Sequence, residues 1–207
     1  MKTLHKQKKY QFAIQLVLSQ YYISPNDLEK KCIPRQYIHK LEKEGYIQKF
    51  SRGVYISNAF AEEPGFASYL LACKQIPSCI ICLLSALEYY GVTTQIPHQI
   101  WIAVEENYKM PRNFPFPLKI IRMSKNSLNA GVETKKVAGN EYRIFNLAKT
   151  IADCFKYRTK IGLDVAMEAL HDGLRKKIVT PDQIYKYSKI NRVTKIVKPY
   201  LEYAKNG

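Results

Sequence analysis

The chain has 207 residues, and 46% of them are hydrophobic, so the composition supports a folded core and excludes a wholly disordered protein. It carries 33 Lys and Arg residues against 17 Asp and Glu residues, a formal net charge of +16. A chain this basic usually has a polyanionic partner, most often nucleic acid, although an anionic environment without a specific ligand is the alternative. Residues 1–60 hold 11 basic and 4 acidic side chains, so the positive charge per residue is highest there.

The cysteines and the apolar segments indicate where the protein works. Five cysteines occur, an odd number that fits reduced thiols in the cytoplasm better than a disulfide framework. The basic N-terminus is not followed by a long apolar run, and the most apolar segment, around residues 80–87, is too short to span a bilayer. We therefore predict a cytoplasmic protein without a membrane partner.

Cys79 and Cys82 have the C-x-x-C spacing of a metal-binding pair. A zinc site needs a second pair of soft ligands at matching spacing, but the other cysteines and the four histidines are scattered. Residues 79–90 have the pattern of a helix, on which these two positions share one face. The sequence predicts a pair of core thiols, with no metal and no cofactor.

The first 58 residues contain three helix signals and then a hairpin signal. Ser24 is a favourable N-cap, Pro25 fits the first helical position, and Asp27 adds negative charge to the first turn. Gly45 suits the left-handed residue after a helix, and Gly53 suits a hairpin turn with positive φ. The expected elements are helices at 10–18, 24–31 and 34–44, and strands at 46–50 and 54–57 joined by residues 51–53.

This order of elements is the plan of a winged helix-turn-helix domain, in which the third helix enters the major groove and the hairpin approaches phosphates or the minor groove. The third helix directs Ile38 and Leu41 inward and keeps a donor-rich face outward. Cations and small donors also occupy the hairpin. The candidate DNA-binding residues are Arg35, Gln36, His39, Lys40 and Lys43 on the helix, and Lys49, Ser51 and Arg52 on the hairpin.

A second domain is expected over residues 66–207, after a linker at residues 59–65 that contains Pro64 and Gly65. Its pattern is α+β, with a small central sheet and a helical C-terminus. Helices are expected at 66–74, 79–90, 146–156, 163–174, 180–188 and 193–204, and strands at 99–104, 118–122, 132–137 and 141–145. Residues 107–117, with three prolines, are expected to form a loop.

No motif predicts a catalytic site. Glu105 and Glu106 follow a predicted strand, with Lys119 on the next, as in some metal-dependent nucleases, but a two-metal site needs more carboxylates converging on one point. Solvated acids are the simpler interpretation. Asp153 lies in an apolar helix, where we expect a structural role: pairing with Lys149 or Arg158, or capping a loop.

Three segments together resemble the AbiEi antitoxins, the transcriptional-regulator half of type IV (abortive-infection) toxin–antitoxin pairs. GYIQKFSRGVYI resembles the wing of the family, and LLSALEYYGVTTQIPHQIWIAV resembles its central helix and following strand. FNLAKTIADCFKYRTKIGLDVAMEAL resembles its C-terminal helices, with Asp153 and Cys154 matching the family pattern. Tyr90 stands where the family usually has histidine, and Lys149 where arginine is common.

The resemblance implies a non-enzymatic protein that binds inverted repeats upstream of its own operon and represses it. It also implies that the C-terminal domain counteracts a nucleotidyltransferase-like toxin, by direct contact or otherwise. Two alternatives stay open: a winged-helix-targeted nuclease that uses Glu105 and Glu106, and a protein-interaction module that covers an acidic toxin surface. Two copies are needed on an inverted repeat, and the sequence contains no coiled-coil heptads that would supply a dimer.

Overall fold

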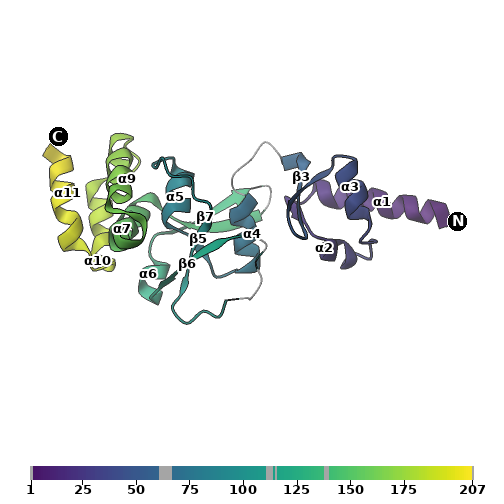
Figure 1. Ribbon diagram of the computed structural model, residues 1–207, viewed down its shortest axis with the longest axis horizontal. Coiled ribbons are helices and arrows are strands. Elements are labelled where there is room, and N and C mark those ends of the chain that lie inside the picture. Colours follow the sequence, from purple (N-terminus) through teal and green to yellow (C-terminus); the bar gives the residue numbers. More distant parts are fainter. Residues whose placement is uncertain (1, 61–66, 111–113, 115, 138–139, 207) are drawn as a thin grey trace. The chain divides into compact units, whose positions relative to one another are not determined.

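The computed structural model describes residues 2–60, 67–110, 114, 116–137 and 140–206; of these, residues 2–5, 51, 67, 137 and 204–206 are described by their backbone alone. The chain is a mixed α+β protein of two compact units, one built mainly from residues 1–71 and the other from residues 72–112, 117–135 and 142–207. Figure 1 shows the elements of each unit and labels most of them. The predicted linker falls mostly outside the described residues; before it, Asn58–Phe60 form a single 3₁₀ turn.

The first unit packs three helices on a small sheet. Its strands lie in the order β1-β3-β2, and both pairings are antiparallel. Its buried core includes Ala13, Val17, Leu28, Ile38 and Leu41. Its elements are α1 (Lys2–Leu18), β1 (Tyr22–Ile23), α2 (Pro25–Glu29), α3 (Tyr37–Lys43), β2 (Ile47–Ser51) and β3 (Val54–Ser57).

Local signals in this unit act largely as the sequence predicts. The Ser24 hydroxyl accepts a hydrogen bond from the Asp27 N–H, and the Asp27 carboxylate accepts one from the Ser24 N–H, which completes a capping box. Gly45 has φ of +76° and Gly53 has φ of +74°, as their predicted positions require. The strand β1, which has only two residues, was not predicted.

Several predicted boundaries in this unit are wrong. The first helix, α1, begins at Lys2, well before the predicted start at residue 10. The third helix begins at Tyr37 and not at Pro34, because the chain first forms two tight turns in which the N–H groups of Tyr37 and Ile38 donate to the third residue before each. No side chain caps the helix at Gln36. The hairpin turn is also shorter than expected, since Ser51 still belongs to β2 and pairs with Val54.

A five-stranded sheet organises the second unit, with the strands in the order β6-β5-β4-β8-β7. β5 runs parallel to β6, while the central β4 pairs antiparallel with β5 and parallel with β8. The strands are β4 (Ile80–Ile81), β5 (Ile100–Glu105), β6 (Leu118–Met123), β7 (Val132–Val137) and β8 (Asn140–Phe145). Residues 138–139, where the predicted hairpin turns, and residues 111–113 and 115 of the predicted loop lie outside the described residues.

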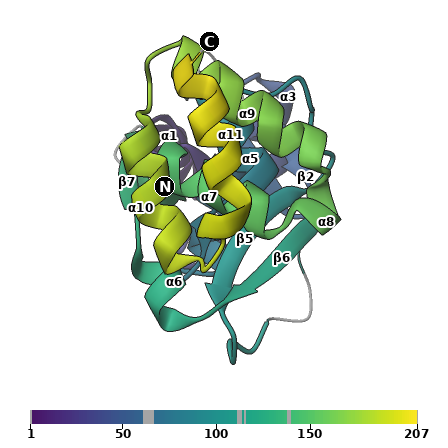
Figure 2. The same cartoon turned by 90° about the vertical axis from the view of Figure 1, so that its left-hand side faces the viewer.

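Helices cover the sheet and continue beyond it to the C-terminus, where α7, α9, α10 and α11 gather at one end of the unit (Figures 1 and 2). α7 is the centre of this group, and all of its residues from Leu147 to Phe155 are buried. Thr180 and Gln183 form a capping box at the start of α10. The helices are α4 (Ala67–Gln75), α5 (Leu83–Tyr90), α6 (Lys125–Asn129), α7 (Leu147–Lys156), α8 (Arg158–Ile161), α9 (Leu163–Arg175), α10 (Pro181–Ile190) and α11 (Thr194–Asn206).

The helix predicted over residues 79–90 is wrong in its first turn. Ile80 and Ile81 form β4, and α5 begins only after Cys82, whose backbone is extended. β-Branched isoleucines suit this central strand. Cys79 and Cys82 therefore do not share a helix face, although both are buried, as expected of core thiols. The short helices α6 and α8 were not predicted.

Candidate nucleic-acid interface

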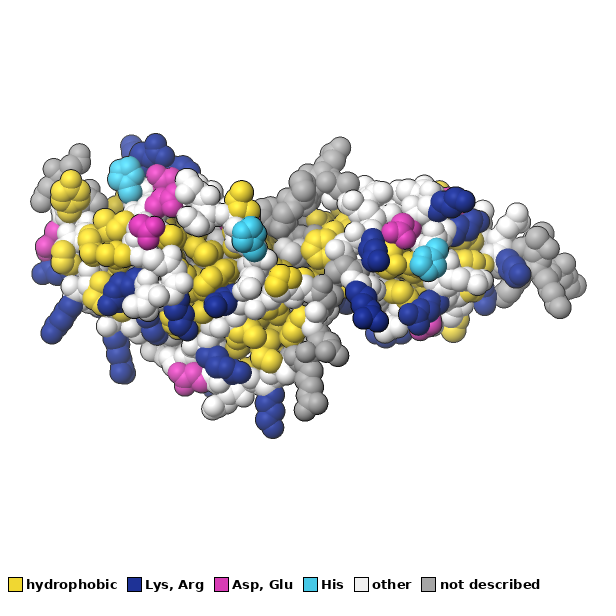
Figure 3. Space-filling view, in the orientation of Figure 1, with side chains coloured by type: hydrophobic (Ala, Val, Ile, Leu, Met, Phe, Trp, Pro, Cys, Tyr) yellow, Lys and Arg dark blue, Asp and Glu magenta, His cyan; other side chains and the backbone are white. Residues whose placement is uncertain are grey.

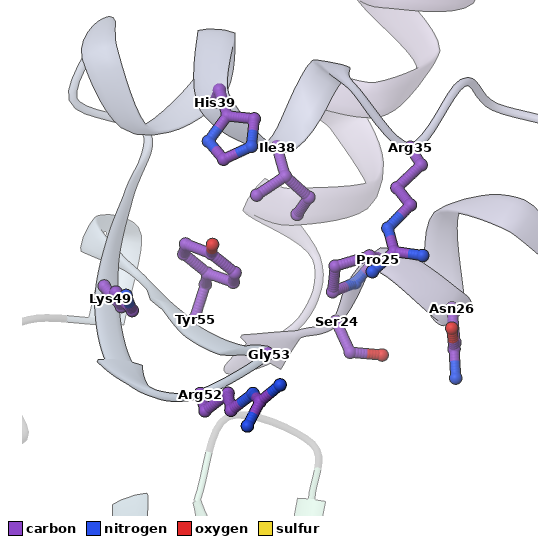
Figure 4. Close-up of a pocket in the computed structure, with 10 residues that line it drawn as sticks. All are labelled: Ser24, Pro25, Asn26, Arg35, Ile38, His39, Lys49, Arg52, Gly53 and Tyr55. Atoms are coloured by element: carbon purple, nitrogen blue, oxygen red, sulfur yellow. The ribbon is translucent and has the colours of Figure 1, made fainter.

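A groove of about 540 Å³ opens on the first unit between α2, α3 and the β2–β3 hairpin (Figure 4). Residues from three separate chain segments line it, so it exists only in the folded unit. The lining residues are Ser24, Pro25, Asn26, Arg35, Ile38, His39, Lys49, Arg52, Gly53 and Tyr55.

Four predicted DNA-binding residues meet at this groove: Arg35, His39, Lys49 and Arg52. All four side chains are exposed. Neither arginine, nor Lys49, forms an ion pair within 4.0 Å with any residue whose side chain is described, so these charges face solvent. Figure 3 shows dark blue cationic side chains, with a cyan histidine among them, on one face of this unit. Free guanidinium and ammonium groups around a concave surface are suited to phosphate oxygens.

Tyr55 and Ile38 give the groove a buried floor. Tyr55 lies opposite Lys49 across the hairpin and is only 6% exposed, and Figure 4 shows its ring beneath His39. Burial and the nearby Glu42 carboxylate raise the pKa of the Tyr55 phenol, against the opposing effect of Arg35. A phenol is already protonated near neutral pH, and this upward shift of its pKa reinforces that state, in which the hydroxyl can act as a hydrogen-bond donor.

A second, shallower depression continues from the groove past the start of α3. Pro34, Arg35, Gln36 and His39 line it. Arg35 and His39 belong to both depressions, so Gln36 adds an amide to the same continuous face. The two turns before α3 produce this arrangement, since they place residues 34–36 on the surface.

Lys40 and Lys43 do not line either depression. The Lys40 ammonium lies 3.9 Å from the centre of the Tyr10 ring and 3.7 Å from the Glu44 carboxylate. The Tyr10 hydroxyl in turn donates to Glu44 at 2.6 Å, which ties this part of α3 to α1. Lys43 is exposed on α3, and the side chain of Ser51 lies outside the described residues.

Three residues that line the groove were not predicted from the sequence to be binding residues. Ser24 had only a capping role in that prediction, and its hydroxyl indeed donates to the Asp27 carboxylate at 2.7 Å. Asn26, in the first turn of α2, is exposed and lines the groove. Tyr55 lies in a predicted strand, and the sequence does not show that it lines the groove, because its position in the floor depends on the packing of β3 behind α3.

The structure does not bring the nuclease candidates together. Glu105 ends β5 and pairs in register with Met123, whereas Lys119 pairs with Trp101, four residues earlier on β5. At a rise of about 3.3 Å per residue, Lys119 is roughly 13 Å along the strands from Glu105. Both Glu105 and Glu106 are exposed. Within the described part of the chain, no three His, Cys, Asp or Glu residues are grouped so that they could hold a metal ion.

Comparison with protein-family models gave no match for the chain, and comparison with curated protein sequences also gave none. Across the residues that the structure describes, no helix has the length and apolar character needed to cross a membrane.

Proposed function

We propose that this protein is a sequence-specific DNA-binding repressor, with the first unit acting as a winged helix-turn-helix domain. The observation that carries the proposal is the groove at which Arg35, Lys49 and Arg52 meet, each without an ionic partner among the described side chains. In this proposal α3 enters the major groove of double-stranded DNA and the β2–β3 hairpin is the wing.

The residues divide into two groups by the contacts that we assign to them. We assign base-edge contacts to Arg35 and Gln36, which lie in the turns directly before α3, because residues at the N-terminal end of a recognition helix contact the bases of the major groove. Lys49 and Arg52 on the wing hold phosphates, which fixes the register of the domain on the duplex. His39 and the Tyr55 hydroxyl add donors between the two groups.

Fluorescence anisotropy over a salt series tests this function, with the duplex upstream of the protein's own gene and a scrambled duplex of equal length. Preference for the native duplex that survives physiological salt supports a sequence-specific regulator. Equal and steeply salt-dependent affinity for both duplexes contradicts it, because the charge would then act only as a general polyanion surface.

We further propose that the DNA target is an inverted repeat in the operator of its own operon, and that the second unit counteracts a nucleotidyltransferase-like toxin in the cytoplasm. The support for this role is the resemblance of three segments to the AbiEi antitoxins. Co-expression with a nucleotidyltransferase encoded next to the gene tests it by growth rescue. An Arg35→Ala/Arg52→Ala variant separates the two activities, since it should lose repression and keep rescue.

A further inference from the structure

Two thiols of the second unit lie next to each other where α4 leads into β4. The sulfur atoms of Cys73 and Cys79 are 3.5 Å apart. Cys73 lies in the last turns of α4, and Cys79 directly precedes Ile80 of β4. The Ile76 N–H donates to Ala72 and the Cys79 N–H donates to Ile76, so a hydrogen-bonded turn holds the two cysteines together.

An arginine fixes this turn from the neighbouring strand. A guanidinium nitrogen of Arg143, on β8, donates to the carbonyl oxygens of Pro77 at 2.7 Å and Cys79 at 3.3 Å. The guanidinium therefore supplies positive charge beside the thiol pair. Formation of an S–S bond of about 2.05 Å needs the two sulfurs to approach by only about 1.5 Å.

The two thiols differ in access and in acidity. Cys73 is partly exposed, whereas Cys79 is buried. The pKa of the Cys73 thiol is lowered, first by the hydrogen bond with Cys79 and also by Arg143, although burial acts in the opposite direction. The same hydrogen bond and burial raise the pKa of Cys79. The accessible thiol is thus the one that more readily becomes a thiolate, the reactive form.

We propose that Cys73 and Cys79 are a redox-modification site that peroxides convert into a reversible intramolecular disulfide. The Cys73 thiolate attacks one oxygen of hydrogen peroxide, the O–O bond breaks, and the other oxygen leaves as hydroxide and takes a proton to become water. The Cys79 sulfur then attacks the sulfur of the Cys73 sulfenic acid. The S–O bond breaks, and the hydroxide leaves with the Cys79 proton as a second water. Two thiols are oxidised, and one peroxide is reduced to two waters.

The other cysteines provide internal references on the same chain. Cys82 and Cys154 are buried, and burial raises the pKa of both thiols. Cys32 is exposed on the first unit and has no cysteine neighbour among the described contacts. A reagent that oxidises cysteines by access alone would therefore modify Cys32 first, whereas the proposed site favours Cys73.

The test treats the reduced full-length protein with hydrogen peroxide, blocks the remaining thiols by alkylation, and maps them by mass spectrometry. We expect a Cys73–Cys79 cross-linked peptide that dithiothreitol cleaves, and loss of the free Cys73 thiol on the order of tenfold faster than loss of Cys82 or Cys154. Oxidation of Cys73 no faster than that of those two thiols overturns the proposal, and so does a disulfide that forms only between molecules through Cys32.

Two variants distinguish the roles of the pair, and a third is the control. Cys79→Ala should stop the reaction at the sulfenic acid of Cys73, which dimedone traps, and Cys73→Ala should leave Cys79 reduced. Cys32→Ala should oxidise as the wild type does. The wild-type measurement needs no variant, so a folding defect in any of them does not affect its outcome.

Discussion

The Lys149 ammonium lies 2.5 Å and 2.6 Å from the two carboxylate oxygens of Asp153, one helical turn further along α7, and neither side chain is exposed. The side-chain NH₂ of Asn191 donates to the same carboxylate at 2.7 Å, and the Ser127 hydroxyl donates to the side-chain oxygen Oδ1 of Asn191 at 3.0 Å. This buried network joins α6, α7 and the end of α10. It confirms that Lys149 is the partner of Asp153; Arg158 instead donates to the carbonyl oxygen of Phe155.

Removal of the carboxylate charge should strongly destabilise the second unit. In Asp153→Asn the Lys149 ammonium is left buried without a counter-ion, so we expect the free energy of unfolding to fall by about 3–5 kcal/mol. Urea unfolding followed by circular dichroism measures this loss. Lys198 and Glu202 form a matched surface pair, also one turn apart, with exposed side chains 3.5 Å from each other. Glu202→Gln should therefore change stability by less than about 0.5–1 kcal/mol. Equal effects of the two substitutions would contradict a charged buried pair.

The same variant should show a characteristic pH dependence. Burial lowers the pKa of Lys149, and the attraction to Asp153 works against that shift. Without Asp153 the pKa should fall further, so at neutral pH the unfolded chain binds the lysine proton more readily than the folded protein does. Stability then rises with pH up to the ordinary lysine pKa of 10.5. We expect the stability difference between Asp153→Asn and the wild type to shrink between about pH 7 and 10. A constant difference would contradict the mechanism.

Gly131 offers a steric test of packing around the same lysine. Its φ is +72°, and a Cβ atom there would lie 2.8 Å from Lys149 Cβ and 3.0 Å from the Tyr187 ring. Gly91 also has positive φ, +61°, but a Cβ there would meet no atom within 4 Å. Gly91→Ala should thus cost about 1–2 kcal/mol through backbone strain alone. Gly131→Ala adds overpacking to this strain, for a total of about 2–5 kcal/mol. Thermal and urea unfolding of both variants measures which substitution lowers the free energy of unfolding more. A smaller loss in Gly131→Ala than in Gly91→Ala would show that the residues around Gly131 move to accommodate the added Cβ atom.

The groove predicts a ranking of DNA-binding variants. Arg35→Ala should cost about 1–3 kcal/mol of discrimination and relax sequence preference. Arg52→Ala should weaken binding to all duplexes and reduce the slope of log K against log salt by about 0.9. Lys40→Ala should also weaken binding to all duplexes, but less than Arg52→Ala does, because the Lys40 ammonium already contacts Tyr10 and Glu44. Anisotropy titrations over a salt series measure all three.

The charge-matched control for this series is Lys8→Ala on α1, which removes one positive charge away from the groove. If Lys8→Ala weakens binding as much as Arg52→Ala does, net charge and not the groove determines affinity. If Lys40→Ala lowers the affinity for the native duplex more than Arg35→Ala does, the ranking is wrong. The DNA-binding face of α3 would then extend toward α1.

Features with a local physical cause could be predicted from the sequence. Ser24 and Thr180 cap their helices because each can bond to the N–H of a residue three positions later. Gly45 and Gly91 end helices because their positive φ strains other residues. The apolar strand patterns gave β5 and β6 to within a residue.

Features that depend on distant partners could not be predicted. β1 and β4 have only two residues each, too few for a period-2 pattern, and they exist because β3, β5 and β8 pair with them. The candidate site divides in the same way. The cations on α3 and the hairpin follow from spacing, whereas the roles of Asn26 and Tyr55 in lining the groove appear only when α2 and β3 pack beside α3.

The shortness of β4 also bears on the order in which the second unit folds. β5 and β6 share six registered residue pairs, whereas β4 joins them to β8 through Ile80 and Ile81 alone. Ile81 pairs with Ile144, far along the chain, so this junction closes a long loop and gains few backbone hydrogen bonds in return. The two halves of the sheet should therefore form first and merge late. During refolding, pulse-labelled hydrogen exchange should protect the amides of β5 and β6 before those of Ile80 and Ile81.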